Sequence, residues 1–494
     1  MEKFVIFGAG DLGITALHFL GDKRVSHFID NDKKKQRKTL EGKTIISIDE
    51  YIEKDIKDKI VVSVSEKYVR EIITQLVKSE INNFMLFSEV AHEETKKKLL
   101  NRVDYINIYY KAIGWIIKNT NNGVGVICNS KFKKSYPEVT GYYIPSLLRW
   151  GYKELAIQYA KWLCNIQHEN GAWYDTEDKE PYIFDTAQIL KGLVAIRGYL
   201  PEVDAHILKG CDWILSNMTS EGRLVSLLEN PWGDGKTYSE LIHTYCISPI
   251  KEAGKLLNRE DYVKKADLIA DYYTTKCRDK ILNFDLLSHF YAYVMEAMID
   301  IGHEELAKEA MDKIAAIQKE SGAVPGYNNV DWVCSTGLFQ LALVWFRLGD
   351  LERGNKAFEY ACKLQNETGG WYGSYISEEN PDERNTYFPD AEISWANKYF
   401  LDALYYKNLA TFEQQSSIFC QSISDSDGRY KCIEMLVDGL NKENIGGKIL
   451  DVGCGKGRYL KNLASKYPDM EYYAVDLSVK VMEYFDDIEI VEKK

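Results

Sequence analysis

The sequence WLCNIQHENGAWY, residues 162–174, decides the fold because variants of it return about every fifty residues. Related segments start at residues 115, 213, 314 and 361, with the sequences WIIKNTNNGVGV, WILSNMTSEGRL, IAAIQKESGAVP and ACKLQNETGGWY. A double-length step separates Gly222 from Gly322, and residues 265–285 fill it with a degenerate unit that has lost the glycine. The sequence therefore contains six copies of one supersecondary unit.

Each unit combines an amphipathic stretch, a glycine-containing loop and a second apolar stretch. In second stretches such as FDTAQILKGLVAI, residues 184–196, apolar residues recur at helical spacing. We interpret glycines such as Gly171 as helix C-caps, where a left-handed conformation costs little without a Cβ. Six hairpins predict an α/α toroid over residues 100–410, with one helix of each pair inside the ring and the other outside. An open solenoid is the structural alternative.

Length and composition are typical of a multidomain protein. The chain has 494 residues, 45% of them hydrophobic, and a net charge of −12. This charge argues against a nucleic acid partner, because phosphate contacts need a basic face. The N-terminus enters FVIFGAG without a signal peptide, and no segment has about eighteen consecutive apolar residues. We expect a cytoplasmic protein without a membrane span, while its oligomeric state stays open.

Residues 1–95 contain a strand, a glycine turn and a helix, which is the context of a dinucleotide-binding fingerprint. The turn carries Gly8, Gly10 and Gly13, and a second strand ends at Asp30, whose carboxylate suits ribose hydroxyls. FGAGDLG, HFIDND and GKTIISIDEY resemble the Rossmann-like N-terminal domain of bacterial sugar acetyltransferases and of polysaccharide-biosynthesis dehydratases and epimerases. The resemblance implies a nucleotide or nucleotide-sugar at these glycines. The alternative is that they only permit the tight turn.

Residues 411–430 are polar and predict a linker, and residues 431–494 begin another α/β domain. KILDVGCGKGRYLKNLASKYPDMEYYAVDLS resembles the start of class I S-adenosylmethionine methyltransferases. The resemblance implies that S-adenosylmethionine would bind at Asp451, Gly453, Gly455 and Asp476. The chain stops after the first few strands of that fold, so we expect an incomplete domain. Cofactor binding and methyl transfer are expected only if the chain is longer in nature.

The loops after the repeat glycines are rich in Trp, Tyr, Asn and Asp. Aromatic rings offer flat faces to the apolar side of a sugar, and their polar tips bind its hydroxyls. We therefore expect a carbohydrate-binding rim, whose aromatic residues are Trp173, Tyr174, Trp232, Trp332 and Trp371. The alternative is that each tryptophan caps its own hairpin.

Polar residues also occupy the starts of the second helices, where packing alone would favour apolar ones. If these helices form the inner ring, the side chains converge on one cavity, and acids with His and Tyr suit proton transfer. The catalytic candidates are Glu138, Tyr142, Asp185, His243, Tyr245, His289, Tyr291 and Glu392, and the further substrate-binding candidates are Gln188, Gln340 and Trp395. The alternative is that each is a helix cap or a satisfied buried group. No metal is expected, since Asp331 and Cys334 lack a following His to complete a zinc site.

The segments EVTGYYIPSLL, FDTAQILKGL and EISWANKYFLDAL resemble a bacterial group of toroid proteins found with surface-polysaccharide genes. They are more distantly similar to glucuronyl 5-epimerases, unsaturated glucuronyl hydrolases and squalene-cyclase/prenyltransferase repeats. The resemblance implies a carbohydrate-active enzyme of polysaccharide biosynthesis, of epimerase, lyase or hydrolase type. A module that binds a glycan or lipid-linked sugar for a methyltransferase is the alternative. A terpenoid toroid is the third possibility, although residues 100–410 lack a DxDD or DDxxD motif.

Overall fold

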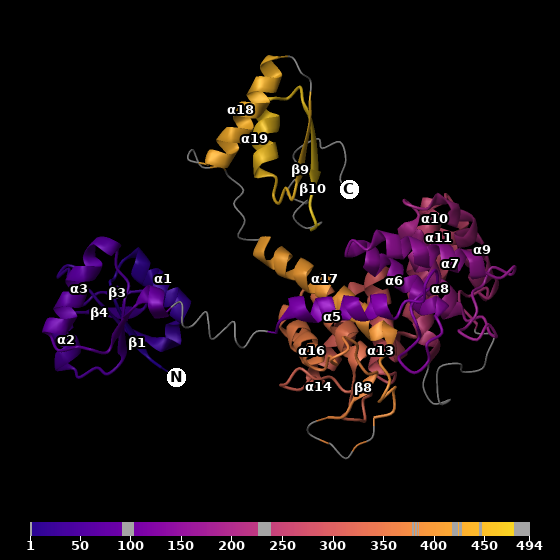
Figure 1. The fold of residues 1–494 in the computed structure, drawn as a ribbon, viewed down its shortest axis with the longest axis horizontal. Coiled ribbons are helices and arrows are strands. Elements are labelled where there is room, and N and C mark those ends of the chain that lie inside the picture. The colour runs from indigo at the N-terminus through magenta and orange to yellow at the C-terminus, as the bar shows by residue number, and fades with distance from the viewer. Residues whose placement is uncertain are drawn as a thin grey trace. The chain divides into compact units, whose positions relative to one another are not determined.

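The computed structural model describes residues 2–90, 103–225, 239–377, 380, 383, 385–416, 423, 427–443 and 447–478. The chain divides into two compact units, Met1–Val103 and Asp104–Lys494, and Figure 1 shows the elements of each. Trp232, one of the expected rim residues, lies outside the described residues.

The first unit is built around a six-stranded sheet with a single antiparallel pair, β3 with β4. The strands lie in the order β3 (Thr39–Leu40), β4 (Lys43–Ile46), β2 (Val25–Ile29), β1 (Phe4–Phe7), β5 (Lys59–Val62) and β6 (Phe84–Leu86). The helices are α1 (Asp11–Leu20), α2 (Ile48–Glu53) and α3 (Glu66–Lys78). Because both faces of the sheet are covered, β1 is apolar throughout: Phe4 and Ile6 belong to one core cluster, Val5 and Phe7 to the other.

The second unit contains six helical hairpins between residues 104 and 416 (Figure 1). The outer helices are α5 (Tyr105–Lys118), α7 (Lys153–Ile166), α9 (Asp204–Ser216), α11 (Glu260–Lys276), α14 (Glu304–Ile317) and α16 (Leu351–Lys363). The inner helices are α6 (Pro137–Arg149), α8 (Ile183–Ile196), α10 (Ile247–Leu256) with the preceding 3-10 helix η3 (Ser239–Cys246), α13 (Ser288–Asp300), α15 (Ser335–Arg347) and α17 (Ser394–Ser416).

The inner helices close into a ring. Helix α6 packs against α8, α8 against both α10 and η3, η3 against α13, α13 against α15, and α15 against α17. Helix α17 then packs against α6. Glu392, just before α17, strengthens the closure by accepting a hydrogen bond from Trp115 Nε1 of α5 at 2.7 Å. The helical arrangement is therefore the predicted toroid and not an open solenoid.

The repeated sequence specifies the contact between neighbouring hairpins. Gln167 Nε2 donates to the carbonyl of Gly171 at 2.9 Å and to that of His206, on the next outer helix, at 3.0 Å. Gln365 Nε2 donates in the same way to Gly369 at 3.1 Å and to Ile108 of α5 at 3.0 Å, which joins the last hairpin to the first. A glutamine four residues before a glycine thus ties each such loop to the adjacent hairpin.

The glycines of the repeat are not helix C-caps, which corrects the sequence interpretation. Helix α7 ends at Ile166, and Gly171 lies in the loop beyond it with a φ of +92°. A Cβ at Gly171 would lie 2.4 Å from the carbonyl oxygen of Lys209 in α9. Both the left-handed backbone and this close approach require glycine.

The remaining described elements form a small α/β segment. It comprises α18 (Gly428–Lys442), β9 (Lys448–Val452), α19 (Arg458–Lys466) and β10 (Glu471–Val475), with β9 and β10 parallel. Helix α17 continues to Ser416, into the segment expected to be a linker. Within the described part of the chain, no helix combines the length and apolarity needed to cross a membrane.

Candidate acid–base site inside the helical ring

The inner helices place polar and aromatic side chains at equivalent positions inside the ring. The sixth residues of five inner helices are Tyr142, Gln188, Tyr293, Gln340 and Tyr399. Aromatic rings from different helices meet there: the centroid of the Tyr399 ring lies 6.0 Å from that of Tyr142 and 5.9 Å from that of Tyr293. All five residues are almost completely buried, so the centre of the toroid is a polar and aromatic interior rather than an aliphatic core.

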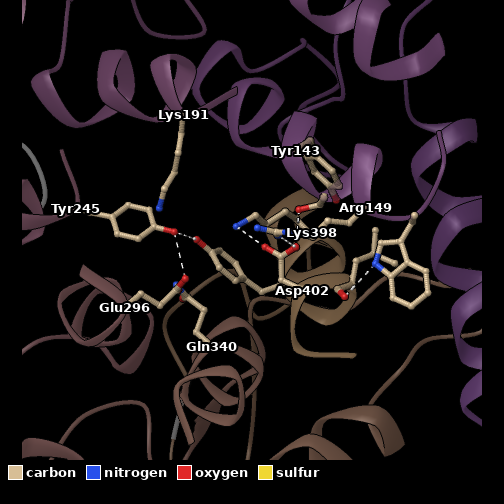
Figure 2. Close-up of polar contacts among 12 residues, drawn as sticks. Tyr143, Arg149, Lys191, Tyr245, Glu296, Gln340, Lys398 and Asp402 are labelled. Atoms are coloured by element: carbon tan, nitrogen blue, oxygen red, sulfur yellow. Dashed lines mark hydrogen bonds and ion pairs between the residues drawn. The ribbon is translucent and has the colours of Figure 1, made fainter. Parts of the chain in front are cut away.

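A hydrogen-bond network crosses this interior (Figure 2). Tyr245 of η3 donates its hydroxyl to Glu296 Oε2 at 3.2 Å and lies 3.5 Å from the Tyr399 hydroxyl. Gln340 Nε2 donates to the other carboxylate oxygen, Glu296 Oε1, at 2.9 Å. The amide oxygen of Gln340 is hydrogen-bonded to His289 Nδ1. Side chains from η3, α13, α15 and α17 therefore form one connected group.

Two buried carboxyl groups, Glu138 and Asp185, lie in the first turns of α6 and α8, which pack directly against each other. We call them the acid pair. Burial raises the pKa of Glu138 well above its usual value, and neighbouring Asp185 raises it further, whereas Lys398 lowers it. Burial likewise raises the pKa of Asp185 to about 8, although a hydrogen bond from the Tyr136 hydroxyl opposes the shift. In both members of the acid pair, burial thus shifts the equilibrium toward the protonated carboxyl.

His289 remains neutral in the same interior. Burial lowers its pKa to about 3, against the effect of the Gln340 hydrogen bond. The imidazole centroid lies 4.7 Å from the Tyr293 ring, and Glu138 in turn raises the pKa of Tyr293. His289 and Glu138 thus share Tyr293 as a neighbour. An unprotonated imidazole and a protonated carboxyl are the two partners that acid–base chemistry requires.

Further along the helices the carboxylates are paired with cations. Asp402 lies 2.9 Å from Lys398 Nζ and 3.1 Å from Arg149 Nη1, and Asp300 lies 2.8 Å from Arg347 Nη1. The cations lower the pKa of both aspartates in spite of burial. We call this group the ion-pair layer; it contains Arg149, Lys191, Asp300, Arg347, Lys398 and Asp402, several of which appear in Figure 2.

The structure brings together a subset of the catalytic and substrate-binding candidates. That subset is Glu138, Tyr142, Asp185, Tyr245, His289 and Gln340. Gln188 occupies the sixth position of α8, and neither atom of its amide has a hydrogen-bond partner among the described residues. A fully buried amide without partners is costly, and sites of this kind are commonly satisfied by a ligand or by water. A substrate-binding role for Gln188 stays a prediction, and its unpartnered amide is the observation that favours it.

The other three catalytic candidates, His243, Tyr291 and Glu392, have contacts outside this hydrogen-bond network. His243 interacts with the backbone of Leu224 and with the Glu240–Arg223 ion pair. Tyr291 donates its hydroxyl to the carbonyl of Ile281 at 2.9 Å, away from its own helix.

Glu392 accepts hydrogen bonds from Trp115, Asn366 and Thr368, which occupy both of its oxygens. These contacts account for Glu392 and Tyr291 by the structure of the scaffold, and a catalytic role for either stays a prediction.

The expected aromatic rim is also corrected, because two of its tryptophans are core residues. Trp173 and Trp371 are fully buried, and their indole N–H groups donate to Leu163 and Ala361 of their own hairpins at 2.7 and 2.8 Å. Trp332 is buried as well. Tyr174 is half-buried and stacks on the imidazole of His168. The tryptophans hold each hairpin together instead of presenting an open sugar-binding surface.

The substrate-binding candidate Trp395 is connected to the network through Tyr387. Its indole Nε1 donates to the Tyr387 hydroxyl at 3.0 Å, and the Tyr387 ring lies 6.2 Å from His289. The residues that sequence reasoning missed are Tyr136, Tyr293, Glu296, Tyr399 and the ion-pair layer. A search for polar residues at the sixth and ninth positions of the inner helices finds Tyr293, Tyr399, Lys191, Glu296 and Asp402.

The glycine turn in the first unit is held closed by nearby side chains. The backbone N–H of Ala9, between Gly8 and Gly10, donates to Asp30 Oδ2 at 2.9 Å, and Lys35 Nζ pairs with the same oxygen at 3.1 Å. A Cβ at Gly13 would lie 1.8 Å from the carbonyl oxygen of Gly8. These contacts account for the glycines and for Asp30 by the structure of the turn, and nucleotide binding stays a prediction.

The glycine loop after β9 has the same construction. The backbone N–H of Gly455 donates to Asp476 Oδ2 at 2.8 Å, and the preceding Gly453 has a φ of +77°. Burial raises the pKa of Asp451, and neighbouring Asp476 raises it further. The aspartate at the end of the second strand thus fixes the loop in both segments, and S-adenosylmethionine binding stays a prediction.

No protein-family model matches the chain, and no curated protein matches it. Among solved structures, a novel alpha-amylase from Clostridium perfringens is 17% identical with a TM-score of 0.45, over 61% of this chain and 97% of that one. D-mannose isomerase is 11% identical with a TM-score of 0.47, over 61% and 96%. A type II terpene cyclase from Scytonema is 12% identical with a TM-score of 0.42, over 62% and 97%. These similarities are distant, and the toroid is established by the helix packing described above.

Proposed function

We propose that the ring interior is the active site of a carbohydrate-modifying enzyme that works by proton transfer. The observation that carries this proposal is the difference in pKa between two groups of buried carboxyls in the ring interior. The carboxyl groups of Glu138 and Asp185 have raised pKa values, whereas Asp300 and Asp402 are neutralised by ion pairs. Buried carboxyls with raised pKa values are characteristic of groups that donate protons in catalysis.

Each group has a defined part in the proposed chemistry. A protonated member of the acid pair donates its proton to a substrate oxygen or carbon, and the resulting carboxylate recovers a proton at the end of the cycle. Gln188, whose amide lacks partners, hydrogen-bonds a sugar hydroxyl. His289 stays neutral and accepts a hydrogen bond from the substrate.

The polarity of the interior supports a sugar over a terpenoid substrate. The interior includes Tyr142, Gln188 and His289, whose polar atoms match the hydroxyl groups of a sugar ring. A hydrocarbon chain would leave the Gln188 amide, which has no partner among the described residues, unsatisfied at a cost of about 1–3 kcal/mol. We propose an epimerase, lyase or hydrolase reaction in the polysaccharide chemistry that the sequence resemblance implies.

The test uses the full chain with a panel of neutral and uronic acid oligosaccharides in deuterated water. Epimerisation leads to deuterium in the sugar, β-elimination to a new ultraviolet absorbance, and hydrolysis to new reducing ends. Glu138→Gln and Asp185→Asn are expected to lower the rate about 100-fold or more. Asp267→Asn is the matched control. Asp267 lies on the outer helix α11 and forms an ion pair with Lys251 of α10.

The pH dependence gives a second test of the same proposal. Because the pKa of Asp185 is about 8, the rate should fall as the pH rises through that value and the carboxyl loses its proton. Binding without turnover of any tested sugar, unchanged in Asp185→Asn, would indicate a glycan-binding module instead.

A further inference from the structure

One chain of hydrogen bonds in the ring interior has a direction that chemistry fixes. It runs from Glu296 of α13 to Gln340 of α15 and then back to His289, which lies about two turns before Glu296 on α13. In an amide side chain the nitrogen only donates and the oxygen only accepts. A carboxylate only accepts, so the Gln340 amide directs its nitrogen to Glu296 and its oxygen to His289.

Glu296 holds this orientation because it receives two donors. The Tyr245 hydroxyl donates to Oε2 and Gln340 Nε2 donates to Oε1. Burial, the largest effect, raises the pKa of Glu296, while Lys398, Lys191 and the Gln340 hydrogen bond oppose the rise. The donors at both oxygens suit a carboxylate, and beside a carboxylate the reversed Gln340 amide would place two acceptors in contact.

The orientation of Gln340 determines which nitrogen of His289 carries the proton. Since an amide oxygen cannot donate, Nδ1 must be the donor in the bond between His289 and Gln340. The neutral imidazole has one proton, so Nε2 has a lone pair. The imidazole lies among the rings of Tyr293, Tyr387 and Tyr399, within the interior that holds the acid pair.

We infer that Gln340, oriented by the Glu296 carboxylate, is a positioning residue that fixes His289 as its Nδ1–H tautomer and presents Nε2 as the acceptor for substrate. The use of Nε2 rests on the proposed function, whereas the tautomer does not. Gln340 acts through His289 and has no chemical step of its own.

The experiment measures the tautomer directly on the full chain. Histidine labelled with ¹⁵N at both ring nitrogens reports the tautomer through long-range proton–nitrogen correlations, and His289→Asn assigns the signals of His289. We expect a neutral ring protonated at Nδ1 in the wild type. Gln340→Met keeps the length of the side chain and removes the acceptor, so the proportion of Nε2–H tautomer should rise.

Two further variants separate positioning from a general loss of structure. In Glu296→Gln the new amide can donate as well as accept a hydrogen bond, so the Gln340 amide should no longer be held in one orientation. His289 should then show a mixture of tautomers. This test remains available if Gln340→Met does not fold. Tyr245→Phe is the control, because it removes the other donor to Glu296 and leaves the Gln340 contact, so Nδ1–H should persist.

The kinetic and structural outcomes can be distinguished. With an active substrate, Gln340→Met should lower kcat on the order of 10-fold with little change in KM, because it misplaces an acceptor without removing a binding group. An Nε2–H tautomer in the wild type, or an unchanged tautomer in both Gln340→Met and Glu296→Gln, would overturn the inference. Neither result bears on the deuterium and product assays, which test the acid pair separately.

Discussion

The acid pair and the ion-pair layer are made of the same kind of side chain in different surroundings. Asp185 and Asp402 are both almost completely buried on inner helices. Asp402 is neutralised by Lys398 and Arg149 and its pKa is lowered, whereas among the described residues the Tyr136 hydroxyl is the group that opposes the effect of burial on Asp185, whose pKa rises to about 8. Burial alone therefore does not set the pKa of a carboxyl; the charges beside it decide the direction of the shift.

The difference between the acid pair and the ion-pair layer also concerns the stability of the fold. A buried carboxylate with matched cations is part of the fold, and removing it leaves unpaired charges. A buried carboxyl without a matched cation weakens the fold at neutral pH, and such groups persist where activity requires them. Substitutions at the two places should therefore change stability in opposite directions.

The largest effect is expected for Asp402→Asn. This change removes the negative partner of Lys398, whose side chain is only 4% exposed, and leaves a buried positive charge. The free energy of unfolding should fall by about 3–5 kcal/mol, as for other broken buried ion pairs. Urea denaturation of the full chain, followed by circular dichroism, measures the change.

The exposed i,i+4 pair between Lys264 and Glu260 is the matched control for Asp402→Asn. Glu260→Gln should change the free energy of unfolding by less than about 1 kcal/mol, because solvent screens the pair. Equal effects at the two positions would refute the distinction between them.

Asp185→Asn should change stability in the opposite direction and in a pH-dependent way. The folded-state pKa of about 8 lies above an unfolded value of about 4, so the wild type loses stability as the pH rises between these values. The asparagine variant lacks this loss and should be more stable by about 1–3 kcal/mol at pH 8, with little difference near pH 4. Urea denaturation at several pH values tests this. A variant that is less stable at every pH would contradict the raised pKa.

Ser146→Ala should have a smaller effect within the ion-pair layer. The Ser146 hydroxyl donates to Asp402 Oδ1 at 2.6 Å and is buried. Loss of this charge-assisted bond should cost about 1.5 kcal/mol. Thr140→Val on the same helix is the control: the Thr140 hydroxyl has no partner among the described residues, so this isosteric change should be close to neutral.

Gln188→Met should give the smallest effect and should stabilise the protein. The change replaces a buried amide that has no partner among the described residues with an apolar side chain of similar length. A gain of about 1 kcal/mol is expected. Gln340→Met is the comparison, because the Gln340 amide is hydrogen-bonded at both ends and its loss should destabilise the fold. Thermal unfolding of both variants, together with sugar binding, separates a stability effect from a binding effect.

The helical repeat could be predicted because its signals are local. The spacing of apolar residues and the recurring Gln-x-x-x-Gly are properties of short segments, and each segment forms the same hairpin wherever it occurs. The role assigned to Gly171 was wrong, because the close approach of Lys209 belongs to a different hairpin. Trp173 was also misinterpreted, since an aromatic residue after a glycine has the same sequence pattern whether it faces solvent or the core.

The sequence by itself determined that this chain forms repeated helical hairpins and that polar residues begin the inner helices. Only the tertiary structure decided which of those residues act together. Arg149 and Asp402 are far apart in sequence and form an ion pair, whereas Asp185 lies beside Glu138 and forms no ion pair with any residue that the structure describes. The pKa of a carboxyl depends on burial and on the charges around it, and ring closure brings those charges together from both ends of the repeat.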